Sequence, residues 1–141
     1  MGWGPAADRL SGMHAFRRAV EARDLDAAIA LLADDVVFRS PIAHKPYRGK
    51  DVVGLILRTV VTVFEDFRYE QEIGADDADR HALIFAAAVD GLQLQGCDFV
   101  HTDADGRIDE FTVMLRPLNA VQAFAAKMGA AFQAAIAGPQ P

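Results

Sequence analysis

The chain has 141 residues, of which 52% are hydrophobic. The hydrophobic content is sufficient for a core, and the length is sufficient for one domain but too short for two. Its formal net charge of -6 argues against nucleic acid and anionic membranes as partners, because both require clustered Lys and Arg side chains. A lone cysteine, Cys97, excludes an internal disulfide and suits a reducing cytoplasm, and no Cys/His group has the spacing of zinc ligands.

Neither of two candidate segments has the features of an export or membrane signal. The first ten residues, MGWGPAADRL, lack the basic and apolar regions of a signal peptide. The apolar run VVGLILRTVVTVF at 52–64 contains Arg58 and is shorter than the roughly 20 residues that span a bilayer. We interpret it as a buried helix and expect a cytoplasmic protein with no membrane partner.

The first third of the chain is predicted to form two helices and a strand. Apolar residues recur every three or four positions between about residues 6 and 23, which indicates an amphipathic helix. Asp24 is a suitable N-cap for a second, short helix over 25–33. The segment DVVFRS at 35–40 is predicted to be a strand that ends at Pro41, which has no N–H to donate to a sheet.

After a proline-containing loop at 41–49, a third helix is predicted to run to about residue 65. The apolar period then changes to two, which is typical of strands. The predicted strands cover 67–75, 80–89, 92–102 and 107–115. Acidic and glycine turns such as Asp90-Gly91 join them, so we expect an antiparallel meander. Pro117 then opens a last helix over 118–135.

Helices followed by a curved antiparallel sheet indicate an α+β fold, in which one face of the sheet lies on the helices. We expect a cone-shaped barrel wrapped on the N-terminal helices, with the C-terminal helix beside it, and such cones tend to hold a ligand. The domain is expected to cover 6–136, between a disordered N-terminus at 1–5 and a disordered tail at 137–141.

Four segments resemble one known superfamily in their order and spacing. They are ARDLDAAIALLADDVVFRSP, PYRGKDVV, LQGCDFVHTDADGRI and TVMLRPL. Together they resemble the nuclear transport factor 2-like superfamily, in particular its SnoaL-like and ketosteroid isomerase-like members, over nearly the whole chain. The resemblance implies the cone fold, and it implies no cofactor, because the family's proton-transfer chemistry needs none. The sequence likewise contains no glycine-rich loop that would bind phosphate.

The resemblance also implies positions for catalytic groups. Ketosteroid isomerases have a Tyr on the first helix, a general-base Asp before the loop proline and a protonated Asp on the third strand of the sheet. These positions fall on Phe16, Ser40 and Asp98. Only Asp98 keeps the family's group, because phenylalanine cannot donate a hydrogen bond and serine is not basic near neutral pH.

Asp98 can be interpreted in two ways. Alternation along 92–102 places Asp98 and Val100 on one face of the strand and His101 on the other. If Asp98 faces the cone, burial raises its pKa and leaves it a neutral hydrogen-bond donor at pH 7. Otherwise it is a structural carboxyl bonded to a buried Trp, Tyr or backbone group.

The leading hypothesis is a domain that binds a small, largely apolar molecule in the conical pocket, with Asp98 as a neutral donor. The residues expected to line the pocket are Phe16, Phe38, Ser40, Phe64, Asp98, Phe111, Val113 and Leu115.

Two other functions remain open. One is a cofactor-free acid/base enzyme of the isomerase, lyase or polyketide cyclase kind, with Asp98 assisted by Ser40 or His44. The other is a non-catalytic dimeric interaction module. The strands hold too many apolar residues for one buried face, which predicts a homodimer through the sheet. No metal site is expected.

Overall fold

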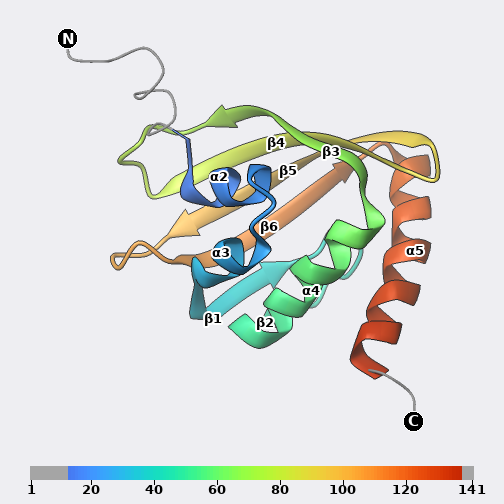
Figure 1. The fold of residues 1–141 in the computed structure, drawn as a ribbon, viewed down its shortest axis with the longest axis horizontal. Helices are drawn as coiled ribbons and strands as arrows, with labels where there is room; N and C mark the ends of the chain where they lie inside the picture. The colour runs from blue at the N-terminus through green and yellow to red at the C-terminus, as the bar shows by residue number, and fades with distance from the viewer. Residues whose placement is uncertain (1–12, 138–141) are drawn as a thin grey trace.

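The structure is a computed structural model and describes residues 13–137. It is an α+β fold in which helices lie against one mixed sheet (Figure 1). The elements are α2 (Ala15–Glu21), α3 (Leu25–Ala30), β1 (Leu32–Arg39), β2 (Tyr47–Arg48), α4 (Lys50–Val63), β3 (Glu65–Ile73), β4 (Arg80–Val89), β5 (Leu92–Thr102), β6 (Ile108–Arg116) and α5 (Leu118–Ala137). The predictions for 1–12 and 138–141, which include the first turns of the helix expected from residue 6, lie outside the described residues.

The sheet has six strands in the order β2-β1-β6-β5-β4-β3. The predicted antiparallel meander of β3 to β6 is confirmed. The sheet as a whole is mixed, because β1 pairs with β6 in parallel and with β2 in antiparallel fashion. It is an open sheet, with β2 and β3 at its edges, and not a closed barrel.

Three helices, α2, α3 and α4, cross one face of the sheet, and α5 stands along one end of it (Figure 1). Asp24 caps α3 as predicted, since its side chain accepts from the N–H of Ala27 at 3.0 Å. From α5, Phe124 and Met128 reach the core and pack with α4 and the strands. Among the described residues, no helix is both long enough and apolar enough to cross a membrane.

Two boundaries differ from the predictions because strand pairing decides them. The second helix ends at Ala30, and β1 begins at Leu32, three positions before the predicted start. There the N–H of Ile108 donates to Leu31 O at 2.8 Å, and Leu32 pairs with Ile108. Strand β2 lies inside the segment predicted as a loop at 41–49, because Tyr47 pairs with Phe38 of β1.

Strand β3 contains a bulge that changes which residues face the helices. Tyr69 pairs with Phe85 of β4, whereas Glu72 pairs with Leu83, so three steps on β3 match two on β4. Phe85 and Leu83 are both buried, and therefore Tyr69 and Glu72 lie on the same inner face. Simple alternation would have placed them on opposite faces.

Candidate functional site

A cavity of about 790 Å³ lies between the helices and the inner face of the sheet. This volume is in the range of about 300–1,000 Å³ that is usual for small-molecule sites. Most of its wall is apolar and aromatic. The polar residues that line it are Glu21, Arg23, Ser40, Asp66, Arg68, Tyr69 and Asp98.

Most residues expected to line the pocket do line this cavity. They are Phe16, Phe38, Ser40, Phe64, Asp98, Phe111 and Val113. Leu115 is not among the lining residues, which corrects that expectation. It pairs with Gly96 on β5, and its Cδ2 atom would lie 2.7 Å from a Cβ added to that glycine. Leu115 therefore packs over Gly96 and not into the cavity.

Asp98 shares a face of β5 with Val100, as alternation predicted; this is the inner face of the sheet, and Asp98 is 6% exposed. Its Oδ2 atom accepts a hydrogen bond of 2.9 Å from the hydroxyl of Tyr69, which is 7% exposed. No other hydrogen bond of Asp98 is found within residues 13–137. The second carboxyl oxygen is therefore available to a molecule in the cavity.

Burial controls the protonation of this pair. It raises the pKa of Asp98 to about 7, although the hydrogen bond from Tyr69 acts in the opposite direction. The pKa of Tyr69 lies well above its usual value of 10, first because the ring is buried and then because of the Asp98 charge. Tyr69 is thus a permanent donor near neutral pH, while Asp98 changes from acid to carboxylate close to pH 7.

Tyr69 was missed by the sequence analysis. The resemblance placed a tyrosine on the first helix, at Phe16, which instead packs edge-to-face on Phe111 at 5.1 Å between ring centroids. The available signal was the alternation in FRYEQEI, which puts Phe67 and Tyr69 on one face. That pattern could not show that this face meets Asp98, because β4 lies between the two strands.

Gly96 makes room for the aromatic wall next to Asp98. It pairs with Phe85, and a Cβ added to it would clash with the Phe85 ring. The Phe85 ring packs on Phe67 at 4.8 Å and on Phe64 at 5.6 Å between centroids. A glycine at this position therefore fixes how far these rings extend into the cavity.

Ser40 and His44, the residues expected to assist Asp98, have different locations. Ser40 lines the cavity, but its Oγ accepts from the N–H of Ile42 at 3.1 Å, a local turn contact. His44 is exposed in the loop before β2 and is not among the lining residues. The structure therefore does not bring His44 into the cavity.

An ion-pair network lies next to Tyr69 on the side of α2. The Arg17 guanidinium carbon lies 6.0 Å from the centroid of the Tyr69 ring. Arg17 is held by Glu21 at 3.4 Å and by Glu72 at 3.5 Å, and Glu72 also accepts from the N–H of His14 at 3.0 Å. The β3 bulge is what brings Glu72 to this side of the sheet.

On the outer face of the sheet, His101, Asp109 and Glu110 place one potential ligand atom each within 4.8 Å of one another. His101 bonds Asp109 at 2.5 Å, which raises the pKa of the imidazole. Arg80 and Arg39 already approach the Glu110 carboxylate, at 3.4 Å and 3.9 Å. The group is thus explained by ion pairing.

Comparisons with known proteins agree with this fold. A family model described as SnoaL-like domain matches residues 13–111. A crystal structure of a steroid delta-isomerase from Pseudomonas aeruginosa is 44% identical, with 86% of this chain and 88% of that chain covered and a TM-score of 0.80.

A second structure, of an uncharacterized protein with a cystatin-like fold from Silicibacter pomeroyi, is 33% identical, covers 86% of this chain and 88% of that one, and has a TM-score of 0.78. A protein of unknown function from Burkholderia pseudomallei, described as NTF2-like, is 19% identical, covers 78% and 92% of the two chains, and shares the fold with a TM-score of 0.61. No curated protein matches the chain by sequence.

Proposed function

Because the chain belongs to the SnoaL-like domain family of the nuclear transport factor 2-like superfamily, we propose that it binds a small, largely apolar molecule, with Asp98 as a neutral hydrogen-bond donor. One observation carries the proposal. A buried carboxyl faces an apolar cavity of about 790 Å³, its pKa is raised to about 7, and one of its oxygens has no partner within residues 13–137.

The chemistry of the pair specifies what the ligand must present. Tyr69 donates to Oδ2 of Asp98, which leaves Oδ1 to carry the proton of the neutral acid. The ligand therefore presents a hydrogen-bond acceptor, such as a ketone or ester oxygen, on an apolar body. Its binding weakens as pH rises through about 7, because the Asp98 carboxylate can no longer donate.

Two ligands of matched shape test this hypothesis. In thermal shift and calorimetric titrations, 2-acetylnaphthalene should bind more tightly than 2-ethylnaphthalene by about two- to tenfold, the usual contribution of one hydrogen bond. The preference should be larger at about pH 6 than at about pH 8. Equal affinity for the two compounds, or no binding of either, would overturn the proposal.

Two variants of Asp98 distinguish its hydrogen-bond donation to the ligand from its change of protonation with pH. Asp98→Asn keeps an oxygen for Tyr69 and an N–H for the ligand, so it should retain the preference for the ketone and lose the pH dependence. Asp98→Leu has no donor and should bind both compounds equally. A preference that persists in Asp98→Leu would show that another group recognises the ketone.

A second candidate function is cofactor-free isomerisation, and the 44% identity to the steroid delta-isomerase favours it. Asp98 would protonate or hydrogen-bond a carbonyl oxygen, and a second group would move a proton between two carbons. Absorbance can follow the conversion of a β,γ-unsaturated 3-ketosteroid to its conjugated isomer. Turnover that is lost in Asp98→Leu would support it. No turnover above buffer would remove this candidate and leave ligand binding in place.

We also propose that two copies of the chain associate through the sheet, whether or not a ligand is bound. Phe99 is 42% and Met114 58% exposed, on the outer faces of the adjacent strands β5 and β6. Large apolar side chains gathered on an exposed face are typical of an interface. Sedimentation should show a dimer at micromolar concentration that dissociates in Phe99→Lys. A monomeric wild type would contradict it.

A further inference from the structure

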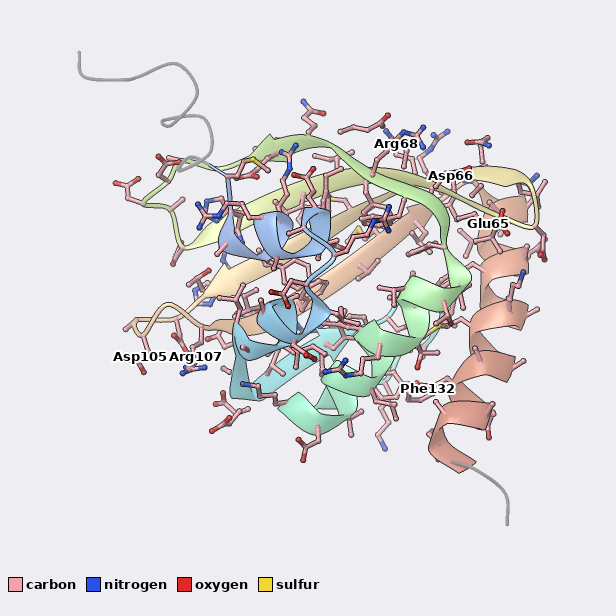
Figure 2. The ribbon with its side chains drawn as sticks, in the orientation of Figure 1. Glu65, Asp66, Arg68, Asp105, Arg107 and Phe132 are labelled. Atoms are coloured by element: carbon pink, nitrogen blue, oxygen red, sulfur yellow. The ribbon has the colours of Figure 1, made fainter. Side chains whose placement is uncertain are left out.

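The cavity has a second polar region besides Asp98, formed by charged residues. These are Glu21, Arg23, Asp66 and Arg68. All four are exposed, whereas Asp98 is buried, so they mark the opening of the cavity toward solvent. Figure 2 shows Asp66 and Arg68 where β3 leaves the end of α4.

Two of these four charges, Glu21 and Arg68, already have partners. The Glu21 carboxylate is paired with Arg17 at 3.4 Å. Arg68 donates to the backbone oxygen of Asp66 at 3.0 Å and lies 3.9 Å from a carboxylate oxygen of Glu70. The guanidinium of Arg23, by contrast, makes no hydrogen bond or ion pair with any residue in 13–137. Arg23 is therefore the cation at the opening whose hydrogen-bonding capacity is unused.

The backbone at Arg23 is also unusual for a residue with a side chain. It follows the C-cap of α2 with a φ of 58°, and its N–H donates to Val20 O at 3.0 Å. Glycine is the commonest residue at this position of a helix end, because a Cβ in the left-handed region is unfavourable. Glycine would therefore stabilise this helix end better than arginine does. The helix end does not explain why the residue at this position is an arginine.

We propose that Arg23 binds an anionic group, such as a carboxylate or a sulfonate, at the solvent end of a ligand whose apolar body occupies the cavity. The inference rests on the ligand binding proposed above and adds the class of ligand, an amphipathic anion. A guanidinium presents a planar fork of donors that suits such groups. Arg68 adds positive charge at the same opening, and Asp66 opposes it.

Two dyes that differ by one sulfonate provide the test. 8-Anilinonaphthalene-1-sulfonate is anionic, and N-phenyl-1-naphthylamine is the same body without the charge. In fluorescence titrations of the full chain, Arg23→Gln should lower the affinity for the anionic dye by about three- to tenfold and leave the affinity for the neutral dye unchanged. Salt should weaken the anionic dye in the wild type and have less effect in the variant.

Three further variants make the test specific. Arg23→Gly should lose affinity for the anionic dye while its melting temperature stays the same or rises, because glycine suits the left-handed backbone. Asp66→Asn should increase the affinity for the anionic dye, because it removes the opposing charge. The substitution fits the backbone, since asparagine tolerates a φ of 53°. Arg58→Gln is the control, an exposed arginine that pairs with Asp26 and does not line the cavity.

Competition shows whether the dyes occupy the cavity. Excess 2-acetylnaphthalene should displace both dyes, and Val113→Trp, which places an indole ring in the cavity, should weaken the binding of both. If both dyes are displaced but Arg23→Gln weakens them equally, or Arg58→Gln acts as strongly, the role of Arg23 is wrong and cavity binding stands. If neither dye binds or responds to the competitor, cavity binding fails, and the inference fails with it.

Discussion

The hydroxyl of Tyr69 on β3 reaches over β4 and donates a hydrogen bond of 2.9 Å to the carboxyl of Asp98 on β5. The hydrogen bond lowers the pKa of Asp98, and burial, the larger effect, raises it. The two residues together therefore decide whether the polar group inside the cavity is a neutral acid or a carboxylate at a given pH.

Removing the tyrosine hydroxyl should raise the pKa of Asp98 further above about 7, because burial then acts without the opposing hydrogen bond. Carbon NMR of the carboxyl in Tyr69→Phe, assigned with Asp98→Asn, measures this shift. Phe67→Leu is the control, since it alters the same aromatic wall without touching the hydrogen bond. An unchanged or lower pKa in Tyr69→Phe would contradict the arrangement.

Asp98 should make the protein less stable as pH rises. Its pKa is raised from 3.8 to about 7 on folding, so the folded state binds the proton more tightly and the free energy of unfolding falls across this interval. The full effect is on the order of 4 kcal/mol, at about 1.4 kcal/mol per pKa unit. The free energy of unfolding of Asp98→Asn, minus that of the wild type, should therefore increase from about pH 5 to about pH 8.5. Urea unfolding at both values checks it, and an equal difference at the two would show that Asp98 does not titrate in this range.

Gly96→Ala should destabilise the protein by about 1–3 kcal/mol, because the added methyl group overlaps the Phe85 ring. Phe85→Leu in the same chain should recover part of the loss by making space. Gly129→Ala on α5 is the matched control: its Cβ meets nothing within 4 Å, so the same substitution should stabilise the helix. Thermal unfolding of these variants measures the effects, and a neutral Gly96→Ala would contradict the predicted clash.

His101 should stabilise the protein in acid. Its pKa is raised first by the hydrogen bond to Asp109, so its contribution is complete below pH 6.5 and is lost as pH rises through the raised value. His101→Gln should therefore destabilise the protein more at about pH 5.5 than at about pH 9. Asp109→Asn should show the same trend. Equal losses at both pH values would mean that packing, and not charge, is what His101 contributes.

The elements predicted best are those set by local residues. The limits of β4 and β5 are as predicted, because Asp90 and Gly91 both adopt positive φ, 51° and 77°, in the two-residue turn between them. Alternation along a regular strand correctly placed Asp98 and Val100 on one face, and the structure shows that this face is the inner one.

Features that depend on distant partners were not predictable. The start of β1 at Leu32 depends on its pairing with Ile108. Tyr69 reaches Asp98 across a strand between them, and Leu115 leaves the cavity wall because Gly96 opposite has no side chain. The bulge that turns Glu72 inward leaves no mark in the alternation of the sequence.

The parallel pairing of β1 with β6 affects the order in which the molecule folds. It pairs Phe38 with Phe111, two cavity-lining residues that are 73 positions apart in the sequence. Contacts between residues so far apart form slowly, and a chain that leaves the ribosome from its N-terminus cannot make them until β6 has emerged. During synthesis the cavity is therefore completed late, and until β6 has emerged β5 has an unpaired edge.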